Sequence, residues 1–251
     1  MEKLIFNSSW LKQLLPEGMP IPSSTILTGP GGSGKPLIGN LIVADWLTQG
    51  GSVIFMSLQY PDHRFIKSSL KTIAQLDLDA YQGKVAFIEL DVSLEGTQIV
   101  GPNHIKANVV KPDIWNQSIQ TALEMLPKDG PGVLLFGSAL NLLLFSPTYG
   151  ADILEEMKKL LKEESSYSVL FSTSTSAKGD QVAELDSMTD NLIYVRHDQA
   201  SLRLFVKIER VRNAPFFADE VEVPFSHEQL EELKQIADQS RKRIVPLVAK
   251  L

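Results

Sequence analysis

A glycine-rich stretch near the N-terminus carries the residues best suited to chemistry in this chain. Residues 29–36 read GPGGSGKP, which matches the phosphate-binding pattern G-x-x-x-x-G-K up to its lysine. In such a loop the backbone N–H groups surround the phosphates, the lysine contacts the outer phosphates, and a following Ser or Thr hydroxyl binds Mg²⁺. This chain has Pro36 in that last place, and proline offers neither a hydroxyl nor an N–H. The stretch therefore predicts a phosphate site that lacks one magnesium ligand.

We refer to residues 29–36 as the phosphate loop. Its glycines permit positive φ angles and a close approach of the backbone to a ligand, and Lys35 supplies a positive charge. Pro36 is acceptable in a first helical turn, although it disfavours the helical conformation at Lys35. Two outcomes stay open: the loop binds a nucleotide or another anion, or it persists only as a turn. The candidate phosphate-binding residues are Gly29, Gly31, Gly32, Ser33, Gly34 and Lys35.

The elements that must position this loop alternate between apolar β-like runs and amphipathic segments. This alternation is typical of a parallel sheet covered by helices, and no linker divides the chain. We expect a single domain over residues 1–225 and a C-terminal helix and tail over 226–251, packed on it. Residues 95–111 read as a polar loop, and the last three strands as an antiparallel meander at one edge. The predicted strands cover 25–28, 52–58, 85–90, 133–136, 168–173, 191–196, 202–208 and 220–223, and the predicted helices 37–48, 62–75, 114–126 and 152–163.

Composition excludes several classes of protein. The chain has 251 residues, a net charge of −6, no cysteine and four histidines. Without cysteine it has no disulfide, thiolate metal site or thiol nucleophile, and four histidines far apart in the sequence predict no metal site. The acidic balance argues against an extended nucleic-acid face. Because there is no signal-like segment or membrane-length apolar run, we expect a cytoplasmic protein.

The segments around the phosphate loop resemble the RecA-like ATPases, and within them the KaiC-like branch. The resemblance rests on the lead-in at 10–22, the strand and loop at 23–35 and the strand at 49–61, and it extends to about residue 225. Residues 132–138 (GVLLFGS) take the place of the Walker B strand, and 207–213 that of the closing hairpin. The resemblance implies a three-layer α-β-α domain with a mainly parallel sheet and an antiparallel edge, and ATP or ADP as the ligand.

Two further positions depart from what the resemblance implies. Gln59 stands where the catalytic acid would be, and an amide cannot accept a proton from water. Gly137 stands where the Walker B aspartate would be, and it has no side chain to bind metal. Together with Pro36, three positions that would bind the metal or activate water in ATP hydrolysis are changed. A single group of this kind lowers the activation free energy by about 3–4 kcal/mol. We expect no catalytic residues, no tightly bound Mg²⁺ and a pseudo-ATPase that acts as a binding or regulatory module.

Other residues leave alternatives open. Arg210 and Arg212 match by spacing a pair that KaiC-like proteins extend toward a neighbouring subunit, which implies a homo-oligomer; otherwise they are solvated strand charges. Asp91 or Glu95 could replace the missing acids and give a working ATPase, and the hydroxyl-rich residues 172–176 could contact phosphate. A recombinase-like DNA accessory role rests on fold analogy alone. The expected partner is another copy of the chain or another protein or peptide.

Overall fold

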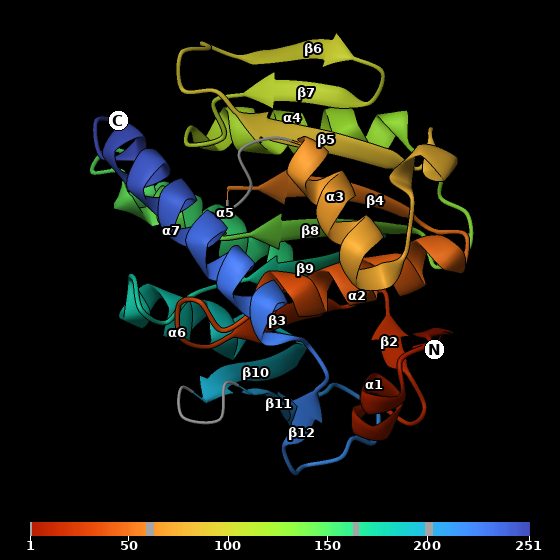
Figure 1. The fold of residues 1–251 in the computed structure, drawn as a ribbon. Coiled ribbons are helices and arrows are strands. Elements are labelled where there is room, and N and C mark those ends of the chain that lie inside the picture. Colours follow the sequence, from red (N-terminus) through yellow and green to blue (C-terminus); the bar gives the residue numbers. More distant parts are fainter. Residues whose placement is uncertain (1, 59–62, 163–165, 199–202) are drawn as a thin grey trace.

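The computed structural model describes residues 2–58, 63–162, 166–198 and 203–251 (Figure 1). Its centre is a ten-stranded sheet, and a small two-stranded sheet of β1 (Glu2–Leu4) and β2 (Met19–Ile21) lies beside it. From one edge to the other, the large sheet contains β12 (Val221–Val223), β11 (Arg203–Arg210), β10 (Asn191–Asp198), β3 (Ser24–Thr28), β9 (Ser168–Ser172), β8 (Val133–Ser138), β4 (Ser52–Ser57), β5 (Val85–Leu90), β7 (His104–Ala107) and β6 (Thr97–Gly101).

The strands from β10 to β7 in this order run parallel, while β6 at one edge and β11 and β12 at the other run antiparallel to their neighbours. Strands β3, β8 and β9 are buried along their whole length because both of their faces are covered, and their apolar centres are flanked by buried Ser and Thr residues. Since parallel strands share one carboxyl edge, the loops that follow β3, β4, β8 and β9 come together there.

Helices cover both faces of the sheet. On one face, α2 (Lys35–Thr48) and α3 (His63–Ala74) pack with Phe55 and Phe136 in a first apolar cluster. On the other face, α4 (Pro112–Met125) and α5 (Gly150–Lys162) pack with Phe171 in a second cluster. These three layers, with an antiparallel sheet edge, confirm the predicted fold class. The remaining helical segments are α1 (Ser9–Leu14), α6 (Gly179–Met188), α7 (His227–Val248), and the short 3₁₀ helices η1 (Leu78–Tyr81) and η2 (Leu140–Phe145).

The C-terminal helix α7 is longer than its apolar stripe predicts (Figure 1). It contacts η2, which follows β8. Its last turns place Ile244 and Val248 in the second apolar cluster. The basic residues 241–243 are exposed within this helix and do not form a separate tail. Within the described ranges, no helix combines the length and apolar character that a membrane span requires.

Two other segments differ from the sequence prediction, the β6–β7 hairpin and α6, while the meander of the last three strands is confirmed. The stretch read as a polar loop contains the hairpin of β6 and β7, in which only Ile105 and Ala107 are buried, too few to give a visible period-two pattern. Strands β10, β11 and β12 form the predicted antiparallel meander at one sheet edge, and β10 also pairs parallel with β3. Helix α6 escaped prediction because it buries only Val182 and Leu185.

Candidate phosphate-binding site

The phosphate loop connects β3 to α2 at the carboxyl edge of the sheet, and its glycines hold a conformation that other residues rarely adopt. Gly29 has a φ of 141°, and a Cβ there would lie 2.0 Å from the carbonyl oxygen of Val195 in β10. Gly32 and Gly34 have φ angles of 73° and 71°, and Gly34 is the N-cap of α2. The turn that the sequence pattern predicts is therefore present, and it requires glycine at these positions.

Lys35 is turned into the loop that it belongs to. Only 4% of the residue is exposed. Its Nζ donates hydrogen bonds to the carbonyl oxygens of Gly29, at 2.9 Å, and Pro30, at 2.5 Å, and to Ser33 Oγ, at 2.9 Å. Burial lowers the pKa of Lys35 to about 7. Because a lysine has three protons to donate, its donors are fully used within the loop.

The burial of Lys35 predicts a characteristic pH dependence of stability. Below about pH 7 the buried lysine is charged in the folded chain, and the desolvation cost is fully present. Between about 7 and 10.5 the folded chain releases this proton before the unfolded chain does, so the cost falls as pH rises. Relative to Lys35→Met, the wild type should therefore gain on the order of 3 kcal/mol of unfolding free energy between about pH 6.5 and pH 9.5. Urea denaturation at the two pH values measures this difference.

The exposed Lys71 provides the control for that measurement, since 72% of its side chain is accessible. Lys71→Met should change the unfolding free energy by a similar small amount at both pH values. If the unfolding free energies of Lys35→Met and the wild type differ by the same amount at both pH values, Lys35 is not held in a desolvated position.

The hydroxyl-rich residues that follow β9 lie against the phosphate loop. The backbone N–H of Gly31 donates to Ser176 Oγ at 2.9 Å, and the N–H of Thr175 donates to the carbonyl oxygen of Gly29 at 3.0 Å. Asn141 of η2 holds this segment, since its Nδ2 donates to the carbonyl oxygens of Ser174 and Ala177. The amide of Gly31 and the carbonyl of Gly29 thus already have partners in the chain.

The positions that would bind magnesium hold no ligand for it. Pro36 is buried in the first turn of α2. A Cβ on Gly137 would lie 2.3 Å from Leu140 Cδ1 and 2.8 Å from Phe171 Cδ1, so this end of β8 has no space for a carboxylate. At the ends of β4 and β8 the polar contact is instead between hydroxyls, with Ser57 Oγ and Ser138 Oγ 2.6 Å apart. Gln59 lies outside the described residues.

The acids proposed as replacements are far from the loop or engaged elsewhere. Asp91 follows β5, which is four strands from β3, a separation of about 19 Å at 4.8 Å per strand. Its carboxylate accepts hydrogen bonds from the N–H and the hydroxyl of Ser93. Glu95 forms an ion pair with Lys111 at 2.9 Å. Neither residue is therefore placed to activate water beside Lys35.

The acid that contacts Thr28, the residue before the phosphate loop, is Asp186 of α6. Thr28 Oγ1 donates to its Oδ2 at 2.9 Å, while its Oδ1 is buried and accepts no hydrogen bond. Burial raises the pKa of Asp186, and the Thr28 hydrogen bond and the charge of Arg210 oppose that rise. No sequence signal identifies this residue, because it depends on how α6 docks beside β3.

Arg210 and Arg212 contact the end of α6 within the same chain. Arg210 Nη2 donates to the carbonyl oxygens of Asp186 and Thr189, at 2.5 and 2.8 Å. Arg212 Nη1 lies 3.0 Å from Asp190 Oδ1. A guanidinium at the carboxyl end of a helix satisfies its last carbonyl groups and the local negative potential. These contacts assign Arg210 a role inside its own subunit.

Comparison with known proteins rests on structure, because no protein-family model matches the sequence and no curated protein matches it either. A KaiC-like protein of the hyperthermophilic archaeon Pyrococcus horikoshii superposes on 90% of this chain and 96% of its own, with a TM-score of 0.67 and 17% identity. The chain has a KaiC-like, RecA-type fold. This likeness confirms the architecture that the resemblance around the phosphate loop implies.

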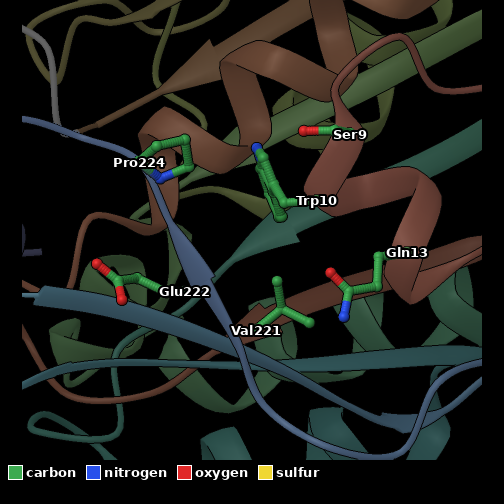
Figure 2. A pocket seen from close by; sticks show the side chains of 6 residues that line it. All are labelled: Ser9, Trp10, Gln13, Val221, Glu222 and Pro224. Atoms are coloured by element: carbon green, nitrogen blue, oxygen red, sulfur yellow. The ribbon is translucent and has the colours of Figure 1, made fainter.

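Two surface hollows of the KaiC-like fold lie away from the phosphate loop. The first hollow, of about 310 Å³, lies between α1 and β12, and the Trp10 side chain lies between these two elements (Figure 2). The other, of about 320 Å³, lies beside α2 and the end of α3, where Asp45 accepts hydrogen bonds from Asn7. Neither hollow includes a residue of the phosphate loop. The first is lined by Ser9, Trp10, Gln13, Val221, Glu222 and Pro224.

Proposed function

We propose that this chain is a KaiC-like P-loop protein that binds a nucleotide or phosphate group without efficient hydrolysis and serves as a binding or regulatory module. The observation that carries the proposal is the packing around Gly137, where Leu140 and Phe171 fill the space of the metal-binding carboxylate. Pro36 supports it, because the first turn of α2 offers no hydroxyl to a magnesium ion. The partner in this proposal is another protein or a second copy of the chain.

Retained phosphate binding is supported by the loop itself. The positive φ angles of Gly32 and Gly34 keep the turn that directs backbone N–H groups toward an anion. Lys35 remains within reach, although it must exchange its bonds to the loop carbonyls for bonds to phosphate. An incoming phosphate would also raise the charged fraction of Lys35, since an opposite charge opposes the effect of burial on its pKa. Magnesium adds little to such binding, because two of its usual contacts are replaced by Pro36 and Gly137.

The test compares stabilisation with turnover on the same purified chain. ATP and ADP should each raise the melting temperature of the wild type, because a ligand that binds the native state stabilises it. The rise should persist in EDTA and disappear in Lys35→Ala. ATP turnover should be at least about a thousandfold below a typical kcat of about 10 s⁻¹, since single stabilising groups each supply a factor of about a hundred or more.

Lys71→Ala is the matched control for that experiment, because Lys71 is an exposed lysine on α3. It should keep the full nucleotide-induced rise in melting temperature. Magnesium-dependent turnover at an ordinary rate that is lost in Lys35→Ala would contradict the proposal. A melting temperature that no nucleotide changes would contradict its binding part and leave the loop as a turn that holds β3 against α2.

A further inference from the structure

Two histidines and a glutamate meet on the sheet face that α3 covers, apart from the phosphate loop. His63 begins α3, Glu89 lies in β5 and His104 begins β7. In the parallel pairing of β5 and β7, His104 lies opposite Phe87, and Glu89 projects on the same side as Phe87 by the alternation of the strand. Although the histidines are far apart in the sequence, the fold brings them to one place.

The polar atoms of this cluster lie at ion-pair distance from one another but without hydrogen-bond geometry. His63 Nδ1 lies 3.5 Å from Glu89 Oε1, and His104 Nε2 lies 3.2 Å from Glu89 Oε2. All three ligand atoms lie within 4.8 Å of one another. His63 Nδ1, Glu89 Oε1 and His104 Nε2 are each buried without a hydrogen-bond partner. Because buried polar atoms are nearly always paired, three such atoms in one place indicate a missing occupant.

The spacing of these atoms fits a metal ion. Zinc binds histidine nitrogen and carboxylate oxygen at about 2.0–2.1 Å in a tetrahedral arrangement, which separates neighbouring ligand atoms by about 3.3 Å. His63 Nδ1 lies 3.5 Å from one oxygen of Glu89 and His104 Nε2 lies 3.2 Å from the other, both close to that separation, and the three ligand atoms lie within 4.8 Å of one another. We propose that His63, Glu89 and His104 bind a divalent transition-metal ion of the zinc class. Two imidazoles argue against Mg²⁺ and Ca²⁺, which take oxygen ligands.

The surroundings suit a site that is formed in advance and lies near the surface. The Phe87 ring lies 5.4 Å from the His63 ring and 6.3 Å from the His104 ring, so it limits how both imidazoles rotate. The side chains of His63, Glu89 and His104 are 34%, 22% and 18% exposed, so the cluster lies near the surface although its ligand atoms are buried. Three protein ligands leave the fourth position of the ion for water or a ligand. The ion would also tie the first turn of α3 to β5 and β7.

This inference is independent of the proposed function and is tested with metal alone. The chain is stripped with a chelator, freed of it, and titrated with Zn²⁺ by calorimetry, with Co²⁺ as a visible-absorption probe and Mg²⁺ as the comparison ion. We expect one Zn²⁺ per chain, cobalt absorption bands of a four-coordinate site, and no saturable heat with Mg²⁺. Glu89→Gln and His104→Gln should each weaken Zn²⁺ binding by about a hundredfold or more, since even indirect changes around such sites cost about 10–100-fold.

His197→Gln is the matched control, because His197 lies in β10, outside the cluster. It should bind Zn²⁺ as the wild type does. His63→Gln, at the solvent-facing start of α3, gives a second ligand variant if His104→Gln is unstable, and circular dichroism checks that each variant is folded. Zn²⁺ should raise the melting temperature of the wild type and of His197→Gln, but not that of Glu89→Gln. No saturable binding to the wild type, or equal binding by the ligand variants, would overturn the assignment.

Discussion

Gly137→Asp is expected to destabilise the chain by more than about 4 kcal/mol and to restore no ATP hydrolysis. The new Cβ would lie 2.3 Å from Leu140 Cδ1 and 2.8 Å from Phe171 Cδ1, so the side chain cannot enter without moving both. Its carboxylate would then lie in an apolar cluster, where an unpaired charge costs several kcal/mol beyond the cost of overpacking. Urea denaturation and an ATPase assay on the same sample measure the two outcomes.

Gly96→Asp is the matched control, because nothing lies within 4 Å of a Cβ built at Gly96. It should change the unfolding free energy by no more than about 0.5 kcal/mol. Gly137→Ala separates the effect of the added volume from that of the added charge. Its loss of unfolding free energy should fall between those of the two aspartate variants, at about 1–3 kcal/mol. Equal stability of Gly137→Asp and Gly96→Asp would mean that the end of β8 does have space for an acid.

Gly29→Ala is expected to cost at least about 3 kcal/mol of unfolding free energy. The φ of 141° at Gly29 is strained for any residue with a Cβ. The added methyl group would also lie 2.0 Å from the carbonyl oxygen of Val195, a backbone atom that moves only if β10 moves. Because β10 pairs with β3, the change should disturb the sheet as well as the loop. Denaturant unfolding measures the loss.

Gly31→Ala, in the same loop, should cost less than about 1 kcal/mol. A Cβ at Gly31 would lie 3.4 Å from Ser174 Oγ, a side-chain atom that can move aside slightly. If both alanine variants prove equally stable, the backbone at Gly29 is not held against β10 in solution.

The layered fold could be predicted from the sequence because its signals are local. The strand predicted at 85–90 matches β5 at both ends, and the strands at 25–28 and 168–173 differ from β3 and β9 by one residue. The phosphate loop was also predictable, since its glycines and lysine stand at fixed spacing between an apolar strand and an apolar helix. In each case neighbouring residues carry the information.

The contacts within the candidate sites could not be predicted in the same way. Ser176 reaches Gly31 only because β9 lies beside β3, a neighbour relation that depends on the order of strands in the sheet. The meeting of His63 with His104 depends on how α3 lies over β5 and β7, and β7 itself is too short to show a clear pattern. The inward turn of Lys35 depends on which oxygens the folded loop presents. Such features follow from tertiary packing, which residue spacing does not encode.

Under the proposed function, the bonds that Lys35 and Gly31 make within the chain would make anion binding an exchange reaction. An incoming anion must replace three oxygens around the lysine and one serine hydroxyl at the loop amide, so its gain is the difference between new and old hydrogen bonds. At the Gly31 amide a neutral bond would be replaced by a charge-assisted one, which is about twice as strong, whereas the bonds of a charged Lys35 are charge-assisted before and after the exchange. A nucleotide polyphosphate, which can accept several of these hydrogen bonds at once, would therefore gain more from the exchange than a small monoanion. This preference would arise from the bonds already present in the loop.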